Sequence, residues 1–216
     1  MAPIAPTPAP AVYSWTGFYI GAHGGYSWSE TSTNFIGAPF WTGTLSGNGG
    51  ASTRLAGFTV GGHVGYNYQF ASSWVAGVEG AWRYQDHSKT IASPFFPTLD
   101  SWTTKVDSIG SVTGRIGYAL NRLLIYARGG LAWGNVHSKA ESAGLVTVSN
   151  SSYRIGWTIG GGAEYALTNN IIAGVEYDYT DLGRHRITQT DGFGFVADRR
   201  VRVQNHALLA RVSWKF

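Results

Sequence analysis

Polar and apolar residues alternate one by one through most of the chain, and this alternation predicts eight β-strands. We expect the strands at roughly 16–29, 55–70, 73–85, 105–120, 123–137, 152–167, 170–182 and 202–216. None of these segments contains proline, which fits strands held in a continuous hydrogen-bonded ladder. No segment keeps the apolar period of a helix over a useful length.

The connections between these segments alternate in length. Tight turns are expected at about 71–73, 121–122 and 168–170, and longer links rich in Gly, Ser, Thr and Asn at about 30–54, 86–104, 138–151 and 183–201. Such a sheet has short turns at one end and long loops at the other, an asymmetry typical of membrane barrels. The predicted fold is therefore all-β: an eight-stranded antiparallel up-and-down transmembrane β-barrel.

Within each predicted strand, one alternating set of residues is apolar and uncharged, and the other set holds the charges. A soluble ligand-carrying barrel would turn the apolar set inward, and a membrane barrel would turn it outward. Charges are sparse for a surface in water, and the polar set is rich in glycine, which suits a crowded interior. Aromatic residues of the apolar set also form two predicted girdles at the strand ends, as expected at bilayer interfaces: Trp28, Trp82, Trp133 and Tyr179 toward the long loops, and Tyr66, Tyr118, Tyr165 and Trp214 toward the short turns.

The polar set predicts an ion-pair network in the lumen, formed by Glu79, Arg83, Arg115, Arg128, Glu164, Glu176, Asp178 and Arg211. The turn at 121–122 makes Arg115 and Arg128 cross-strand partners, and such like charges need intervening carboxylates. Either the network fills the barrel as a satisfied structure, or its pairs exchange to open a narrow pore. We favour the filled barrel, because eight strands leave an interior just wide enough for side chains.

Composition removes several classes of function. Charged residues make up 13% of the 216 residues, against about 25% in an ordinary soluble domain. The chain has no cysteine, so it has neither disulfides nor thiolate metal sites. Its net charge of +4 is too diffuse to predict nucleic-acid binding. Four of the seven prolines lie in the first ten residues, so we expect a disordered Pro-rich leader over residues 1–13 and the barrel domain over 14–216.

The histidines suggest two further possibilities. His23 and His63 are expected to point into the lumen from adjacent strands, where a hydrogen-bonding role is favoured because two histidines alone make an incomplete metal site. The remaining histidines lie in or near the predicted loops and leave haem ligation open, although no motif pairs two of them as axial ligands: His87, His137, His185 and His206. No nucleophile, base and orienting group occur together, so neither a catalytic site nor a cofactor is predicted. A lipid-modifying enzyme that uses His206 is a remote alternative.

Three segments carry a resemblance to a known family. They are W-T-G-F-Y-I-G-A-H-G-G-Y (15–26), L-A-G-F-T-V-G-G-H-V-G-Y-N-Y-Q (55–69) and the terminal R-V-S-W-K-F. Over about residues 13–216 the chain resembles the small porin-like outer-membrane immunogenic proteins of Gram-negative bacteria. Some members of that family are described as haemin-binding. The resemblance implies an OmpA-type barrel in the outer membrane, with a periplasmic N-terminus and extracellular long loops. In such families the barrel-assembly machinery recognises a terminal aromatic strand, which implicates Phe216.

The last long link is basic. Arg184, Arg186, Arg199 and Arg200 would form a rim beside the outer leaflet, where arginine binds the phosphates of lipopolysaccharide. A solvated loop with local ion pairs is the equal alternative. The expected function is structural and surface-displaying: envelope integrity, with contacts to outer-membrane lipid, lipopolysaccharide or host ligands. A narrow porin-like channel or a haem-binding surface receptor is the alternative.

Overall fold

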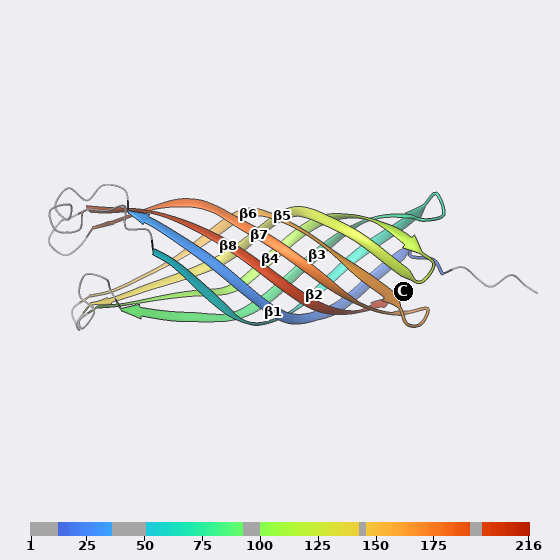
Figure 1. Cartoon of the computed structure of the whole chain (residues 1–216), viewed down its shortest axis with the longest axis horizontal. Helices are drawn as coiled ribbons and strands as arrows, with labels where there is room; N and C mark the ends of the chain where they lie inside the picture. The colour runs from blue at the N-terminus through green and yellow to red at the C-terminus, as the bar shows by residue number, and fades with distance from the viewer. Residues whose placement is uncertain (1–12, 36–50, 93–99, 143–145, 191–195) are drawn as a thin grey trace, which may run out of the picture.

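Eight antiparallel strands close into a single barrel in a computed structural model that describes residues 13–35, 51–92, 100–142, 146–190 and 196–216 (Figure 1). Each strand pairs with its neighbours in the chain, and β1 also pairs with β8. The strands are β1 (Gly17–Phe35), β2 (Ala51–Phe70), β3 (Trp74–Ala92), β4 (Asp100–Leu120), β5 (Leu123–Ser142), β6 (Val146–Ala166), β7 (Ile171–Thr190) and β8 (Val196–Lys215). The predicted fold class is confirmed.

The expected extents of the strands were wrong, because the ladder continues into segments that we expected to be long loops. Strands of 19 to 21 residues are about twice the roughly 9–11 residues that a tilted strand needs to cross a bilayer. The outward face needs apolar residues only where a strand crosses lipid, so alternation can be lost farther along a strand although pairing continues. A segment such as V-T-V-S-N-S-S (146–152) shows no apolar face, yet its Val and Thr residues favour a strand.

The apolar set faces outward, as predicted. Phe58 is 81% exposed, Ile155 68% and Leu131 63%, whereas the charged residues that alternate with them are buried. Such a wall of apolar side chains matches the lipid-facing surface of a membrane barrel. None of the described residues belongs to a helix long and apolar enough to span a membrane.

The three short turns lie together with the C-terminus at one end of the barrel, called here the turn end (Figure 1). Ala71 and Ser72 in the β2–β3 turn and Asn121 in the β4–β5 turn adopt positive φ angles of 47°, 64° and 57°. The two-residue turn at Asn121 and Arg122 places Leu120 opposite Leu123. That register determines which residues of β4 and β5 meet inside the barrel.

An apolar plug fills the turn end of the lumen. Trp15 is fully buried, and its indole Nε1 donates to the carbonyl of Asn121 at 3.0 Å while its backbone N–H donates to Gln69 Oε1 at 2.8 Å. Tyr13 meets the Trp15 ring edge-on at 5.1 Å, and burial raises the pKa of the Tyr13 hydroxyl to about 12, although the positive charge of Arg122 opposes the shift. The rest of the cluster is Val75, Ala119, Leu124, Tyr126, Ala166 and Ile172.

The boundary between leader and barrel at residue 13 stays a prediction, because residues 1–12 lie outside the described part of the chain. Tyr13 itself, which was expected at the end of the leader, packs against the barrel.

Candidate functional site in the barrel lumen

Strand register brings long charged side chains from six strands to one level of the lumen. Arg115 of β4 stands directly opposite Arg128 of β5, as the turn length predicted. Glycines provide the room beside them. A Cβ on Gly160 would lie 2.3 Å from Asp178 Oδ1, and one on Gly174 would lie 2.8 Å from Glu164 Cγ. The glycine-rich polar face is therefore what allows bulky charged groups to share a narrow bore.

Glu79 lies at the centre of the network. Its carboxylate accepts hydrogen bonds from three guanidinium groups: Arg211 Nη2 at 2.5 Å, Arg128 Nη1 at 3.0 Å and Arg115 Nη1 at 3.5 Å. The hydroxyl of Tyr19 also donates to this carboxylate, at 2.8 Å. Glu79 therefore separates the cross-strand pair Arg115 and Arg128, whose like charges would otherwise destabilise the sheet.

Two further carboxylates close the network across the bore. Glu164 lies 2.6 Å from Arg115 Nη2 and 3.5 Å from Arg211 Nε. Glu176 lies 2.6 Å from Arg128 Nη1 and also pairs with Arg211. These contacts link opposite walls of the barrel directly through charged groups.

Two aromatic residues complete the network. The hydroxyl of Tyr126 donates to Glu176 at 2.5 Å. The guanidinium of Arg115 lies over the Tyr126 ring at 4.0 Å and near the Tyr19 ring at 5.5 Å, so cation–π contacts add to the ion pairs. Sequence reasoning missed both tyrosines as network members. The signal that could have found them is their position in the alternating set of residues that points into the lumen.

Arg83 and Asp178 form a further ion pair, at 3.1 Å, on the side of the network away from the turn end. Arg83 also donates to Thr180 Oγ1 at 3.3 Å and to Asn205 Oδ1 at 3.2 Å. Four arginines and four carboxylates thus balance in charge, and each is at most 6% exposed. Buried charges of this kind persist only when they are paired and hydrogen-bonded.

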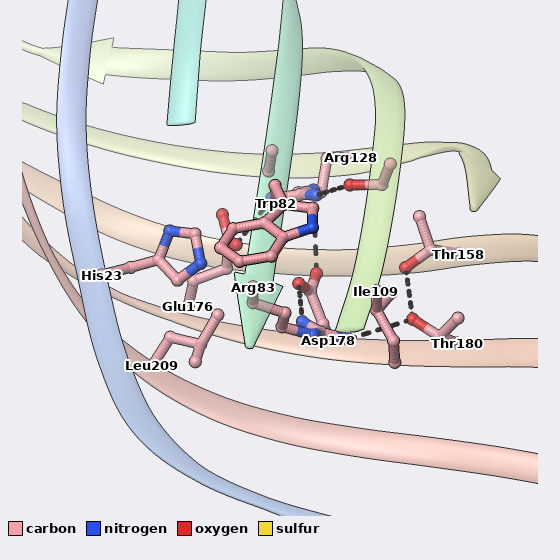
Figure 2. A pocket seen from close by; sticks show the side chains of 12 residues that line it. His23, Trp82, Arg83, Ile109, Arg128, Thr158, Glu176, Asp178, Thr180 and Leu209 are labelled. Atoms are coloured by element: carbon pink, nitrogen blue, oxygen red, sulfur yellow. Dashed lines mark hydrogen bonds and ion pairs between the residues drawn. The ribbon is translucent and has the colours of Figure 1, made fainter. Parts of the chain in front are cut away.

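A small cavity lies between Arg83, Arg128 and Asp178 (Figure 2). Its volume is about 10 Å³, which is enough for about one water molecule. Arg128 Nε and Asp178 Oδ1 are 3.7 Å apart and have no direct hydrogen-bond partner in the described structure. Because its volume is only about 10 Å³, the cavity is too small for a solute larger than water.

His23 and His63 meet inside the lumen. Their Nδ1 atoms are 3.2 Å apart, and their rings stack at 5.4 Å. His63 Nε2 is also 2.8 Å from the hydroxyl of Ser213. Among the described residues, no three histidine, aspartate or glutamate side chains gather in a group that could hold a metal ion. The contacts that His23 and His63 make here are hydrogen bonds, to each other and to Ser213.

The aromatic residues expected in the girdles lie on the outward face of the strands. Trp82, Tyr118, Tyr165 and Trp214 are between 43% and 54% exposed. The others pack against a neighbour. Tyr66 contacts the Phe18 ring at 4.7 Å, Trp133 covers Gly110, and Trp28 and Tyr179 flank His206.

Phe216 follows the last residue of β8 and is 73% exposed. Its backbone N–H donates to the carbonyl of Phe18 at 2.9 Å, which fastens the chain end to β1.

The four arginines expected in a loop instead lie on β7 and β8. In the register of these two strands, Arg186 lies opposite Arg200 and Ile187 lies opposite Arg199. The physical reason is the continued ladder described above. The side chains of Arg184, Arg186, Arg199 and Arg200, and those of His87, His137 and His185, are outside the part of the structure whose side chains are described.

Comparison with known sequences gives one consistent family. The family described as the outer membrane protein beta-barrel domain matches the chain over residues 1–216. The 31 kDa outer-membrane immunogenic protein of Brucella melitensis is 33% identical, over 99% of this chain and 89% of that protein. The 22 kDa outer membrane protein of Rhizobium leguminosarum bv. viciae is 34% identical, over 78% of this chain and 64% of that protein.

Solved structures give the same architecture. The outer membrane protease OmpT from Escherichia coli covers 96% of this chain and 99% of its own, with a TM-score of 0.59 and 8% identity. The outer membrane protein OprG from Pseudomonas aeruginosa covers 93% and 97%, with a TM-score of 0.53 and 12% identity. At such identities the likeness concerns the fold alone.

Proposed function

Because the chain belongs to the family of outer membrane protein β-barrels, we propose that it is a structural and surface-display protein of a Gram-negative outer membrane. The barrel contributes to envelope integrity, and its lumen does not conduct. The turn end and the leader face the periplasm, and the opposite end of the barrel faces outside. The proposal includes no catalytic activity, in keeping with relatives described as immunogenic outer-membrane proteins.

The observation that carries this proposal is the filled lumen. Glu79, Arg115, Arg128 and Arg211 meet across the bore, and Trp15 with its apolar neighbours occupies the turn end. A conducting pore requires continuous water, whereas these side chains contact one another directly. A filled barrel adds rigidity to the wall and leaves the far ends of the strands to contact other molecules.

The absence of cysteine from the sequence allows a direct test of orientation and display. Ala143→Cys places a single thiol between β5 and β6, and Asn169→Cys places one in the turn between β6 and β7. We expect a membrane-impermeant maleimide to label Ala143→Cys on intact cells and Asn169→Cys only after the outer membrane is permeabilised. The reverse pattern would contradict the proposed display.

The same proposal includes lipopolysaccharide as a partner of the basic strand ends. Arg184, Arg186, Arg199 and Arg200 place four positive charges on paired strands, and arginine can bind phosphate through two parallel hydrogen bonds. A variant with all four changed to glutamine should bind lipopolysaccharide more weakly, and its affinity should depend less on salt. Equal affinity and equal salt dependence would remove these residues from the contact.

The proposal also includes recognition of β8 by the barrel-assembly machinery. Trp214 and Phe216 point outward from the closing strand and are 49% and 73% exposed. They present an aromatic edge before β8 pairs with β1. Haem or a host-surface ligand stays a prediction, because the side chains of His87, His137 and His185 lie outside the described part of the structure.

A further inference from the structure

The outward face of β8 changes from apolar to polar within one row of side chains. Leu208 and Val212 are 55% and 57% exposed, as on the rest of the apolar wall. Farther from the turn end, the same row continues with His206, Gln204 and Arg202. Residues two apart on a strand lie on one face about 7 Å from each other. The row thus presents three polar side chains over about 13 Å, where the apolar wall ends.

His206 lies among aromatic side chains. Strand register places it opposite Trp28 of β1 and Tyr179 of β7. Its ring stacks on Trp28 at 5.4 Å with only 5° between the planes, and meets the Tyr179 ring at 5.0 Å. Its Nδ1 lies 2.7 Å from the hydroxyl of Tyr177. This cluster on β1, β7 and β8 is called here the His206 platform.

The contact with Tyr177 is compatible with either tautomer of the imidazole, because a tyrosine hydroxyl can donate to Nδ1 or accept from it. In a neutral imidazole one nitrogen accepts and the other donates. When the Tyr177 hydroxyl donates to Nδ1, Nε2 carries the hydrogen, and this is the tautomer that the proposed site uses. Among the described residues, the His206 ring has a hydrogen bond at Nδ1 and none at Nε2. An N–H donor on a lipid-facing wall therefore bonds to water or to an oxygen of a lipid headgroup.

Arg202 lies in the same row and is also fixed. Its Nε and Nη2 donate to Asp181 at 3.1 and 2.5 Å, and its side chain is 37% exposed. Among the residues whose side chains are described, Nη1 has no hydrogen-bond partner. Gln204, between Arg202 and His206, donates to the hydroxyl of Tyr179. The bonds to Asp181 and Tyr179 orient the row in advance, so a ligand would bind with little further loss of side-chain entropy.

We propose that the His206 platform and Arg202 bind the phosphorylated sugar headgroup of a single outer-leaflet glycolipid. The aromatic faces pack on the sugar, Nε2 of His206 donates to a sugar or acyl oxygen, and Nη1 of Arg202 donates to a phosphate. The acyl chains lie along the apolar wall below Leu208. The site rests on the proposed orientation, which places this end of the barrel outside. Arg184 lies opposite Arg202 in the register of β7 and β8, and Arg186, Arg199 and Arg200 lie farther along these strands.

Binding is tested with the full chain in detergent micelles, with bisphosphorylated lipid A, fully dephosphorylated lipid A and phosphatidylglycerol as separate probes. His206→Phe keeps a ring to stack on Trp28 but removes the donor, and Arg202→Gln removes the charge. Trp82→Phe, on the outward face of β3, is the matched control. Unchanged heat-modifiable gel mobility verifies that each variant is folded.

We expect each site variant to bind bisphosphorylated lipid A about tenfold more weakly than wild type, the loss expected for one charge-assisted or donor hydrogen bond. Trp82→Phe should bind like wild type. For dephosphorylated lipid A, Arg202→Gln should have no effect and His206→Phe should keep its effect. Equal affinities in all four proteins, or equal affinity of the wild type for phosphatidylglycerol, would overturn the site. Cysteine labelling reports independently on the orientation, so a failure of binding with correct labelling counts against this site alone.

Discussion

Glu79→Gln is the sharpest perturbation of the lumen, because it keeps the shape of the side chain and removes one charge. Glu79 faces Arg115, Arg128 and Arg211 and is 2% exposed. The glutamine would retain one acceptor oxygen, and its NH₂ group would point at guanidinium donors. The balance of four positive and four negative charges would become an excess of one buried positive charge.

The expected magnitude follows from burial. Removing one partner of a buried ion pair costs about 3–5 kcal/mol, mostly because the other charge is left uncompensated. For a chain of this size, each kcal/mol shifts the melting temperature by about 2–4 °C. We therefore expect Glu79→Gln to lower the melting temperature in detergent by about 6–20 °C. Loss of heat-modifiable gel mobility, followed against temperature, measures the change.

A double-mutant cycle gives the control. Arg211→Met in the Glu79→Gln background removes one positive charge and restores neutrality, so the double variant should lose less stability than the sum of the two single variants. Glu164→Gln should cost less than Glu79→Gln, because Glu164 contacts two arginines and Glu79 three. A Glu79→Gln protein within about 1 kcal/mol of wild type, with additive effects in the cycle, would refute the network as the source of stability.

Three further predictions concern other parts of the barrel. Trp15→Ala should lower the free energy of unfolding by about 3–5 kcal/mol, because it empties the apolar plug; urea unfolding in detergent measures this, and a change near zero would show that the plug adds nothing. Gly174→Ala should block folding or strongly destabilise the barrel, since its Cβ would lie 2.5 Å from a backbone carbonyl, whereas Gly114→Ala, with nothing within 4 Å, should fold normally; similar refolding yields of the two variants would contradict the packing argument. Deletion of Phe216 should reduce outer-membrane insertion in cells more than refolding in detergent, and equal effects on both would argue against recognition by the assembly machinery.

The sequence predicted the features of the barrel that depend on local geometry. Alternation identified the outward wall, and a two-residue turn was enough to place Arg115 opposite Arg128. Intervening carboxylates were expected there, with Glu79 and either Glu164 or Glu176 as the candidates, and the structure brings all three to the two arginines. These inferences succeed because side-chain direction has a fixed period along a strand and short turns fix the register of neighbouring strands.

Features that depend on distant contacts were not predictable in this way. Nothing in the pattern around Trp15 shows that it inserts into the barrel, because its partners, Gln69 near the end of β2 and Asn121 in the β4–β5 turn, lie far along the chain. The register shift after Asp181 is equally hidden. There the N–H of Gly183, at a φ of 79°, donates to the carboxylate of Asp181, and Leu182 packs inside the barrel. Strand extents failed because pairing beyond the bilayer leaves no alternation to detect.

Single-channel recording in planar bilayers tests the central claim most directly. The full-length wild-type protein, with its folded state verified by gel mobility, should give no stepwise conductance, because the charged network and the Trp15 plug occupy the lumen. Reproducible conductance steps from the folded wild-type barrel would contradict the account and make the same ion pairs a gate.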